Sequence, residues 1–386
     1  MKVLFVLNNI YEKGNGLCTS AQVTVKYLRE AGVDARFLAG KNSDPNGPQP
    51  DFPLERFKFP IFQPLIEANG FCFVKSDEEM IRKAVAWADV IHLEEAFPLE
   101  KKTIDIAKEM GKPLVGTVHL YTQNVMGELP IPIWGKPNDW YMKIWRDKYW
   151  QNCSDISCPT SVLRDHLKKW NFSARLHVIS NGIRIPEERV IAQPVNTPPY
   201  VLLSVGRFSR VKDQETLLNA MNFSKYAKQI QLYFAGKGSM QKSLEKHASK
   251  LVAQGVLSKE YAPVFAFHKH EDLRKIAGNS YLYIHCAKLE VEGLGCIEAL
   301  REGTVPVISK AELVGTTDFA LDERSIYPGG DAKALAAKID WWIEHPAERN
   351  EMAQKYADFA REFDVHKSIE KMIKMYETAL ASNNQQ

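Results

Sequence analysis

A short stretch between residues 290 and 298 combines two carboxylates with two glycines. Glu290 is expected in a loop, and Gly293 and Gly295 open a run that favours helix and contains Glu298. Glycines at a helix start leave backbone N–H groups and the positive end of the helix dipole open to an anion, and carboxylates there can accept hydrogen bonds from sugar hydroxyls. The residues alone equally allow a solvated loop charge at Glu290 and a dipole partner at Glu298, since glycine-rich loops before helices are common.

Two cations form a comparable pattern earlier in the chain. Arg207 and Lys212 lie between a predicted strand, 200–205, and a predicted helix, 214–221. At a strand end beside a helix N-terminus, an Arg can bind a diphosphate through two hydrogen bonds and a Lys can add a point charge. The alternative is a pair of solvated loop cations.

The elements around these residues alternate between strand and helix. Strand 281–286 precedes the glycines, helix 296–301 ends at Gly303, and strand 304–308 follows. The chain opens in the same way, with strand 1–9, a turn that ends at Gly16, helix 19–31 and strand 33–38. Repeated units of this kind predict doubly wound α/β domains with parallel sheets. In such sheets ligands bind at the carboxyl ends of strands, where we expect His119, after strand 113–118.

Length and composition predict two folded domains. With 386 residues, two cores of roughly 180 residues each are expected. The predicted divisions are a first domain at 1–185, a proline-rich linker at 186–199, a second domain at 200–365, and a final segment at 366–386. The net charge of +3 argues against bulk nucleic-acid binding. Nothing in the sequence indicates an oligomeric state.

The cysteines and apolar runs indicate the cell compartment. The six cysteines lack metal-ligand spacing, so we expect no metal site and a reduced, cytosolic compartment. The N-terminus shows no signal peptide, and no run of about 18 apolar residues predicts a membrane span.

The segment 129–151 is rich in aromatic and basic residues. From Asp139, a plausible N-cap, its spacing is helical, and a helix with one aromatic and one basic side can lie in a membrane interface. The alternative is a helix that packs its aromatic residues against the core of its own domain. The number of tryptophans favours the interface, with candidate contacts at Trp134, Lys136, Trp140, Lys143, Trp145 and Arg146.

Several of these segments resemble the retaining glycosyltransferases of family 4. The match consists of Glu290, seven residues, Glu298-Ala299, and then Gly303 before Val305-Pro306-Val307. The runs EVEGLGCIEAL and FALDERSIY are similar to the bacterial branch that glycosylates diacylglycerol or ceramide. GTVHLYTQN and SVGRFSRVKDQETLL also resemble motifs of that family. Arg301-Glu302 departs from the common Ala-Cys, at the helix end rather than on the ligand side.

The resemblance implies a fold and a reaction. The fold is GT-B, with two facing Rossmann-like domains and a cleft between them, and the final helix, 366–386, returns to the first domain. The resemblance implies that the domain 1–185 binds the acceptor and the domain 200–365 binds the nucleotide-sugar. The reaction is transfer of a hexose from a UDP-sugar to a lipid hydroxyl at an anionic membrane, without a metal, by a cytoplasmic protein held at the inner face of the cell membrane.

The resemblance also assigns roles to residues. It implies that His119 and Glu290 contact the transferred sugar, that Glu298 holds the ribose, and that Arg207 and Lys212 act on the diphosphate. Together the implied donor-site residues are Gly16, Arg207, Lys212, Gly236, Gly238, Glu290, Gly293, Leu294, Gly295 and Glu298.

Other functions fit parts of the pattern. A glycosyltransferase acting on a polysaccharide or a small molecule would leave the aromatic segment as core. A nucleotide-sugar-binding protein without catalysis would need fewer of these charged residues. The chain has neither the Gly-x-Gly-x-x-Gly of a Rossmann dehydrogenase next to a strand nor an Asp-x-Asp metal motif.

Overall fold

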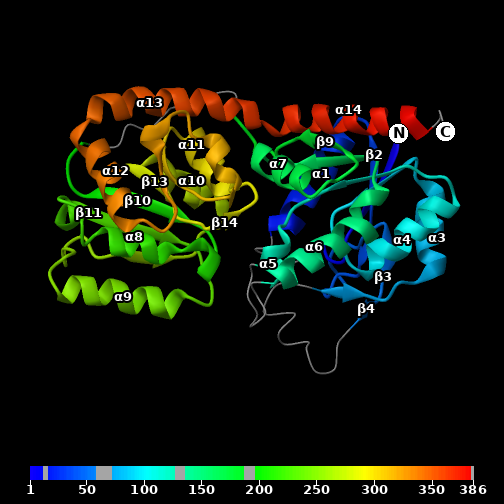
Figure 1. Ribbon diagram of the computed structural model, residues 1–386, viewed down its shortest axis with the longest axis horizontal. Helices are drawn as coiled ribbons and strands as arrows, with labels where there is room; N and C mark the ends of the chain where they lie inside the picture. Colours follow the sequence, from blue (N-terminus) through cyan, green and yellow to red (C-terminus); the bar gives the residue numbers. More distant parts are fainter. Residues whose placement is uncertain (12–15, 58–71, 127–134, 187–195, 384–386) are drawn as a thin grey trace. The chain divides into compact units, whose positions relative to one another are not determined.

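The computed structural model describes residues 1–11, 16–57, 72–126, 135–186 and 196–383, and these divide into two units. Unit 1 consists of Met1–Asn181 together with Val365–Gln386, and unit 2 is Gly182–Asp364. Figure 1 shows both units as helices packed on a central sheet. The predicted linker lies mostly outside the described residues, because 187–195 are not among them.

Unit 1 contains a parallel sheet with the strand order β3-β2-β1-β6-β7-β8-β9. Its strands are β1 (Lys2–Val6), β2 (Asp34–Gly40), β3 (Phe52–Leu54), β6 (Val90–Leu93), β7 (Leu114–Thr117), β8 (Asp155–Cys158) and β9 (Arg175–Val178). Its helices are α1 (Gly16–Glu30), α3 (Glu78–Trp87), α4 (Pro98–Glu109), α5 (Thr122–Met126), α6 (Lys136–Lys148), α7 (Ser161–Lys169) and α14 (Val365–Asn383). The short strands β4 (Arg56–Phe57) and β5 (Phe73–Val74) pair antiparallel.

The strand order of unit 1 reverses between β1 and β6. Val6 pairs with Leu38 of β2 on one side and with Leu93 of β6 on the other. The helix α14 lies beside α1 on one face of the sheet, where Met375 and Tyr376 join Val3, Phe5 and residues of α1 in one apolar core (Figure 1). Right-handed crossovers place α3 and α4 on the opposite face.

Unit 2 repeats the same architecture with its own core. Its parallel sheet has the order β12-β11-β10-β13-β15-β17 and reverses between β10 and β13. The strands are β10 (Tyr200–Val205), β11 (Ile230–Ala235), β12 (Val264–Ala266), β13 (Leu282–His285), β15 (Val305–Lys310) and β17 (Ile326–Pro328), with a separate pair β14 (Leu289–Glu290) and β16 (Leu313–Val314). The helices are α8 (Gln214–Ala220), α9 (Gln241–Ala253), α10 (His270–Gly278), α11 (Leu294–Arg301), α12 (Ala332–Glu344) and α13 (Pro346–Phe359).

In unit 2 the apolar strands β13 and β15 flank the helix α11, which begins with glycines, and this pattern explains the local fold. The strand residues Leu282 to His285 are all buried, as expected for a central parallel strand covered on both faces. Gly293 has a φ of 88°, which favours glycine, and it caps the start of α11. These features place the ends of β10 and β13 and the start of α11 at the same edge of the sheet.

One buried charge cluster lies at the opposite, amino-terminal edge of the unit 1 sheet. The fully buried carboxylate of Asp155 accepts two hydrogen bonds from Arg175, both 2.8 Å, and lies 2.7 Å from Nε2 of His177. Although burial acts to raise it, the hydrogen bonds from Arg175 and His177 lower the pKa of Asp155 well below its usual range. Asp155 is therefore ionised at neutral pH and stabilises the pairing of β8 with β9.

We expect Asp155→Asn to destabilise the protein by about 2–4 kcal/mol, because it removes the buried partner of a guanidinium. A carboxylate with a lowered pKa contributes stability above its unfolded pKa and loses it as the pH falls, so the deficit should shrink below about pH 4. Urea unfolding of both proteins between pH 3 and pH 8 measures this. Asp165→Asn, at an exposed carboxylate paired with Arg164, is the control. An equal deficit in both variants, or a deficit independent of pH, would contradict the assignment.

Candidate active site

The end of strand β10 carries the two predicted cations of unit 2. Gly206 follows the strand with a φ of 145°, and the side chain of Lys212 lies against it, about 3.9 Å from where a Cβ would be. The side chain of Arg207 is exposed and forms no ion pair with any residue that the structure describes. Gln214 donates a hydrogen bond of 3.1 Å to the backbone carbonyl of Arg207. The loop is thus held through its backbone, and the guanidinium is left available.

Lys212 forms an ion pair with Glu290, which lies on β14. Glu290 also lies 3.5 Å from Nε2 of His285, at the end of β13. Although burial raises the pKa of Glu290, the charge of Lys212 and the hydrogen bond from His285 outweigh this effect and lower it to about 2. Glu290 is therefore an anion throughout the neutral range, fixed between a cation and a histidine.

The N-terminus of α11 begins beside this pair. A Cβ at Gly293 would lie 2.5 Å from Oγ1 of Thr316, and one at Gly295 would lie 3.3 Å from the side chain of Val205, at the end of β10. Both glycines thus allow a close approach of the helix start to its neighbours. Its N-cap, Gly293, has no side chain to cap the helix, so the first N–H groups and the dipole suit an anion. Leu294, its first residue, and Glu298, one turn later, are half-buried.

Gly236 and Gly238 lie after β11 and pack against the Arg207 loop. A Cβ at Gly236 would lie 2.0 Å from the carbonyl oxygen of Gly206, and one at Gly238 would lie 2.3 Å from that of Phe208. Phe208 also donates a backbone hydrogen bond of 3.0 Å to Lys237. Any side chain at either glycine would displace this loop. The Cβ side of both glycines therefore faces the loop that presents Arg207 and not a ligand.

Polar residues gather at the corresponding reversal point of unit 1. Asn8 follows β1, and its backbone N–H and side-chain amide donate to one oxygen of Glu95, at 2.7 and 2.9 Å. Glu94 and Glu95 directly follow β6. Both strands end at the position where ligands bind in open α/β sheets.

His119 follows β7 and contacts Glu94 through Nε2. The side chains of Glu94 and His119 are only 3% and 8% exposed, and Oε1 of Glu94 lies 3.3 Å from Nε2 of the buried His92. Burial raises the pKa of Glu94, but its electrostatic interactions with His119 and His92 and a hydrogen bond from His119 lower it overall. These side chains border a recess of about 10 Å³, room for one water molecule, lined also by Thr24, Thr117, Ser157, Ser180, Asn181 and Ser368.

The sequence analysis missed Glu94. The signal was present, because two acidic residues directly follow the apolar strand 90–93. Its partner, however, comes from the next strand, and only the order of strands brings the two together. Gly16 also differs from its predicted place in a turn. It is the first residue of α1, it is exposed, and the space where its Cβ would lie is empty.

The aromatic segment is only partly as predicted. Asp139 is not the N-cap, because α6 begins at Lys136 and is capped by Gly135. Trp145 is 5% exposed and meets the buried Trp150 at right angles, so the prediction that Trp145 faces a membrane is wrong. The physical reason is helical phase: Asn138, Met142 and Trp145 form the buried stripe that packs on the unit's own core.

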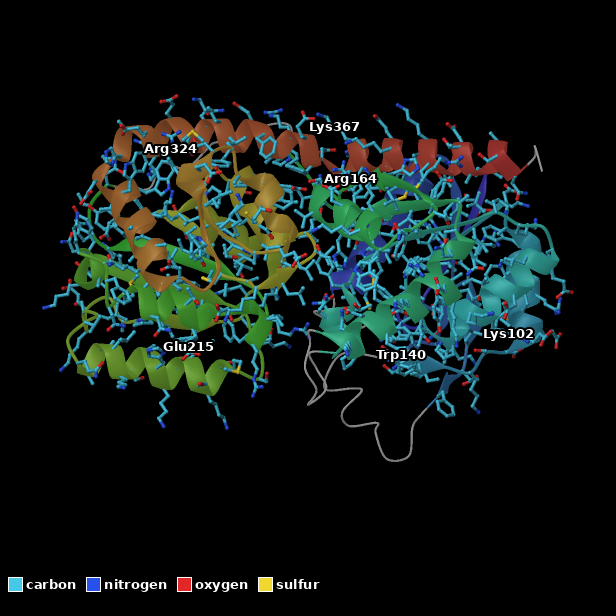
Figure 2. All side chains as sticks on the ribbon, viewed as in Figure 1. Lys102, Trp140, Arg164, Glu215, Arg324 and Lys367 are labelled. Atoms are coloured by element: carbon cyan, nitrogen blue, oxygen red, sulfur yellow. The ribbon has the colours of Figure 1, made fainter. Side chains whose placement is uncertain are left out.

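Trp140, labelled in Figure 2, is on the outer side of α6 and is 67% exposed. Lys136 and Lys143 are exposed as well, while Arg146 is half-buried and donates to the carbonyl of Trp170. Trp134 lies outside the described residues. None of the helices that the structure describes is both long and apolar enough to span a lipid bilayer.

Two family models match nearly the whole chain in succession. Residues 14–185 match the model for Glycosyltransferase Family 4, and residues 187–362 match that for Glycosyl transferases group 1. The chain belongs to glycosyltransferase family 4. The predicted family and the GT-B fold are thereby confirmed, and the protein is a glycosyltransferase with one Rossmann-like sheet in each unit.

Individual proteins are similar to this glycosyltransferase over different parts of the chain. It is 24% identical over 238 residues to alpha-monoglucosyldiacylglycerol synthase of Streptococcus pneumoniae, a match that covers 57% of this chain and 51% of that relative. It is 39% identical to the catalytic domain of cholesterol-alpha-glucosyltransferase from Helicobacter pylori, over 43% of this chain and 99% of that one, with a TM-score of 0.39. The structure of Anabaena HepE, solved with UDP and glucose, is 16% identical over 98% of this chain and all of its own, with a TM-score of 0.67.

Proposed function

We propose that this glycosyltransferase moves a hexose from a UDP-sugar, with retention of configuration, to the hydroxyl of a membrane lipid such as diacylglycerol or ceramide. The observation that carries the proposal is the charge arrangement at the strand ends of unit 2. The exposed guanidinium of Arg207 follows β10, whose last residue, Val205, lies against the start of α11. The Lys212–Glu290 pair joins the same loop to β14, and the N-cap of α11 is a glycine without a side chain.

In the proposed donor site, each of these groups binds a different part of the UDP-sugar. Arg207, Lys212 and the start of α11 neutralise the diphosphate as it leaves, which is the task that a metal ion performs elsewhere. Glu290, fixed as an anion, accepts hydrogen bonds from the sugar hydroxyls. Glu298 binds the ribose, and His119 contacts the transferred sugar. Independence from metals is part of this proposal.

Gly16 completes the proposed donor-site set through its backbone. It opens α1 with no side chain, and no atom of the described residues lies within 4 Å of its Cβ position, so its N–H can approach a phosphate or an acceptor closely.

A lipid acceptor is supported by the relative in Streptococcus pneumoniae, whose name describes glucosylation of diacylglycerol. It is also supported by the exposed Trp140 with Lys136 and Lys143 on the same helix. A tryptophan with lysines is typical of a surface that enters the interface of an anionic membrane. We therefore propose that unit 1 rests on the inner face of the cell membrane through α6.

The test of the reaction is UDP release from a panel of UDP-sugars, each with diacylglycerol, ceramide or no acceptor in mixed micelles. Release stimulated by one lipid supports the proposal and identifies donor and acceptor together. The anomeric configuration of the product, measured by NMR, tests retention. Release that no lipid stimulates would indicate a soluble glycan acceptor, and no release with any donor would contradict the UDP-sugar assignment.

Trp140→Ala should weaken binding to vesicles containing anionic lipid by about tenfold, because an exposed aromatic side chain contributes of the order of 1–2 kcal/mol on entering the interface. Vesicle flotation of the pure protein measures the effect. Phe223→Ala removes a similarly exposed aromatic residue, 55% exposed, from unit 2 and is the matched control. Equal binding by the wild type and Trp140→Ala would remove α6 from the membrane contact.

A further inference from the structure

A chain of buried hydrogen bonds runs from α14 to His119. The hydroxyl of Tyr376 on α14 lies 2.7 Å from Nδ1 of His92, and Nε2 of His92 lies 2.8 Å from Oγ1 of Thr117. The same Nε2 is 3.3 Å from one oxygen of Glu94, whose other oxygen contacts Nε2 of His119. Glu94 thus has a histidine nitrogen at each of its oxygens.

The protons of this chain can be assigned from burial. Burial raises the pKa of Tyr376 well above its usual value, so its hydroxyl keeps its proton and donates to His92. Burial lowers the pKa of His92 to about 4, so the neutral ring carries its one proton on Nε2 and donates it toward Thr117 and Glu94. Glu94 is ionised and accepts, so the proton shared with His119 sits on Nε2 of His119.

This assignment leaves Nδ1 of His119 as the ring atom with no hydrogen-bond partner among the residues that the structure describes. A carboxylate behind a histidine fixes both the ring orientation and the nitrogen that carries the proton. The ring then presents one defined nitrogen at the recess.

The isolation of Glu94 points to a role beyond folding. Within the described parts of the chain no Lys or Arg forms an ion pair with it, and its charge is stabilised only by histidines. A buried carboxylate without a permanent cation costs folding energy that a neutral glutamine would avoid. Such groups occur preferentially where a charge serves a site.

We propose that Glu94 is a positioning residue for His119, and that His92 and Tyr376 hold Glu94 in place. The inference rests on the proposed function, in which His119 contacts the transferred sugar. Glu94 itself touches no reacting atom. It sets which nitrogen of His119 meets the sugar and keeps the ring in one orientation.

The experiment is Glu94→Gln, which keeps the size of the side chain and removes its charge. We expect kcat of the full-length enzyme to fall by about 30- to 100-fold, with KM for the UDP-sugar changed less than about threefold, because the proposed phosphate partners are on unit 2. The ¹⁵N spectrum of the His119 ring should report one tautomer, protonated on Nε2, in the wild type and a mixture in Glu94→Gln. A purely structural role would not move that spectrum.

Matched variants distinguish the positioning of His119 by Glu94 from the general effect of removing a buried polar group. Glu100 is buried in the same region, and burial together with the charge of Glu95 raises its pKa well above the usual range. Its hydrogen bonds come from the backbone N–H of Phe97 and the side-chain amide of Asn8 rather than from His119, so Glu100→Gln should leave kcat and the His119 spectrum unchanged. Tyr376→Phe should lower kcat by about three- to tenfold, whereas Tyr356→Phe, which removes an equally buried hydroxyl from unit 2, should not.

The outcomes distinguish this inference from the proposed function. If the wild type is active, and the Glu94→Gln variant keeps a normal kcat and a single His119 tautomer, the positioning role alone is overturned. If Glu94→Gln does not fold, an unaltered kcat and ring spectrum in Tyr376→Phe would overturn it. A wild type that transfers no sugar from any UDP donor would overturn the proposed function. The ring spectra would still test whether Glu94 sets the tautomer of His119.

Discussion

Arg207→Ala is expected to lower kcat for sugar transfer by about 10²- to 10³-fold, because the exposed guanidinium is proposed to meet charge that develops on the leaving diphosphate. Thermal unfolding should be unchanged, since the side chain pairs with no described residue and the loop is held by the backbone bond from Gln214. Arg207→Lys should recover part of the rate, because an ammonium supplies charge without the two parallel hydrogen bonds.

The control for this prediction is Arg210→Ala. Arg210 is also exposed and lies three residues further along the same loop, so the two variants change net charge equally. Steady-state kinetics with the donor identified by the UDP-release panel measures both. Near-normal turnover in Arg207→Ala, or an equal loss in both variants, would reject the diphosphate clamp.

Lys212→Met is expected to lower kcat by at least 10²-fold and to change the pH dependence of what remains. With the ammonium removed, burial of Glu290 is no longer opposed by a cation, so its pKa rises from about 2 toward the neutral range. Glu290 would then lose its charge as the pH falls, and the variant should lose activity at a higher pH than the wild type. We expect the acid limb of kcat to move upward by at least about one pH unit.

Stability should follow the same sign. Because the folded pKa of Glu290 is lowered, the pair contributes stability above the unfolded pKa of about 4.3 and loses it as the pH falls toward 2. At pH 7 the free energy of unfolding of Lys212→Met, measured in urea, should therefore be lower by of the order of 2–3 kcal/mol. The double variant Lys212→Met with Glu290→Gln should recover most of that loss.

Lys288→Met is the control for the pH profile. Lys288 is more exposed and pairs with Asp213 at 3.0 Å, so its removal leaves the Lys212–Glu290 pair intact. An acid limb that stays in place in Lys212→Met, or moves equally in Lys288→Met, would mean that this pair does not set the charge of Glu290.

The sequence predicted element bounds and residue positions best where a motif is short and local. Strand 200–205 and the two cations that follow it are close together in the chain, so their spacing placed Arg207 and Lys212 after a strand end. Glu290 was predicted in the loop before the glycine-led helix, whereas it lies on the short strand β14. The observed β10 has the predicted bounds, and α11 begins two residues before the predicted helix. The fold class is confirmed, while the chemical roles of these residues stay predictions.

Relations between distant segments were not predictable. The contact of Glu94 with His119 depends on β6 and β7 being neighbours, and the contact of His92 with Tyr376 depends on where α14 docks. The prediction for the aromatic helix α6 was partly wrong for a different reason. Periodicity predicted a helix but not which of its sides faces the core, so Trp140 and Trp145 were grouped although only Trp145 is buried, and the N-cap lies four residues before the predicted one.

The return of α14 to unit 1 has a consequence for synthesis of the protein. All of unit 2 lies between β9 and α14 in the sequence, so a ribosome makes Gly182–Asp364 before the helix that covers the first sheet. During that interval the apolar face around Val3 and Phe5 is covered by α1 but not by α14, which makes the uncovered part a surface for chaperones to protect. His92 also lacks Tyr376 until then, so the proposed support of Glu94 and His119 is incomplete in the nascent chain.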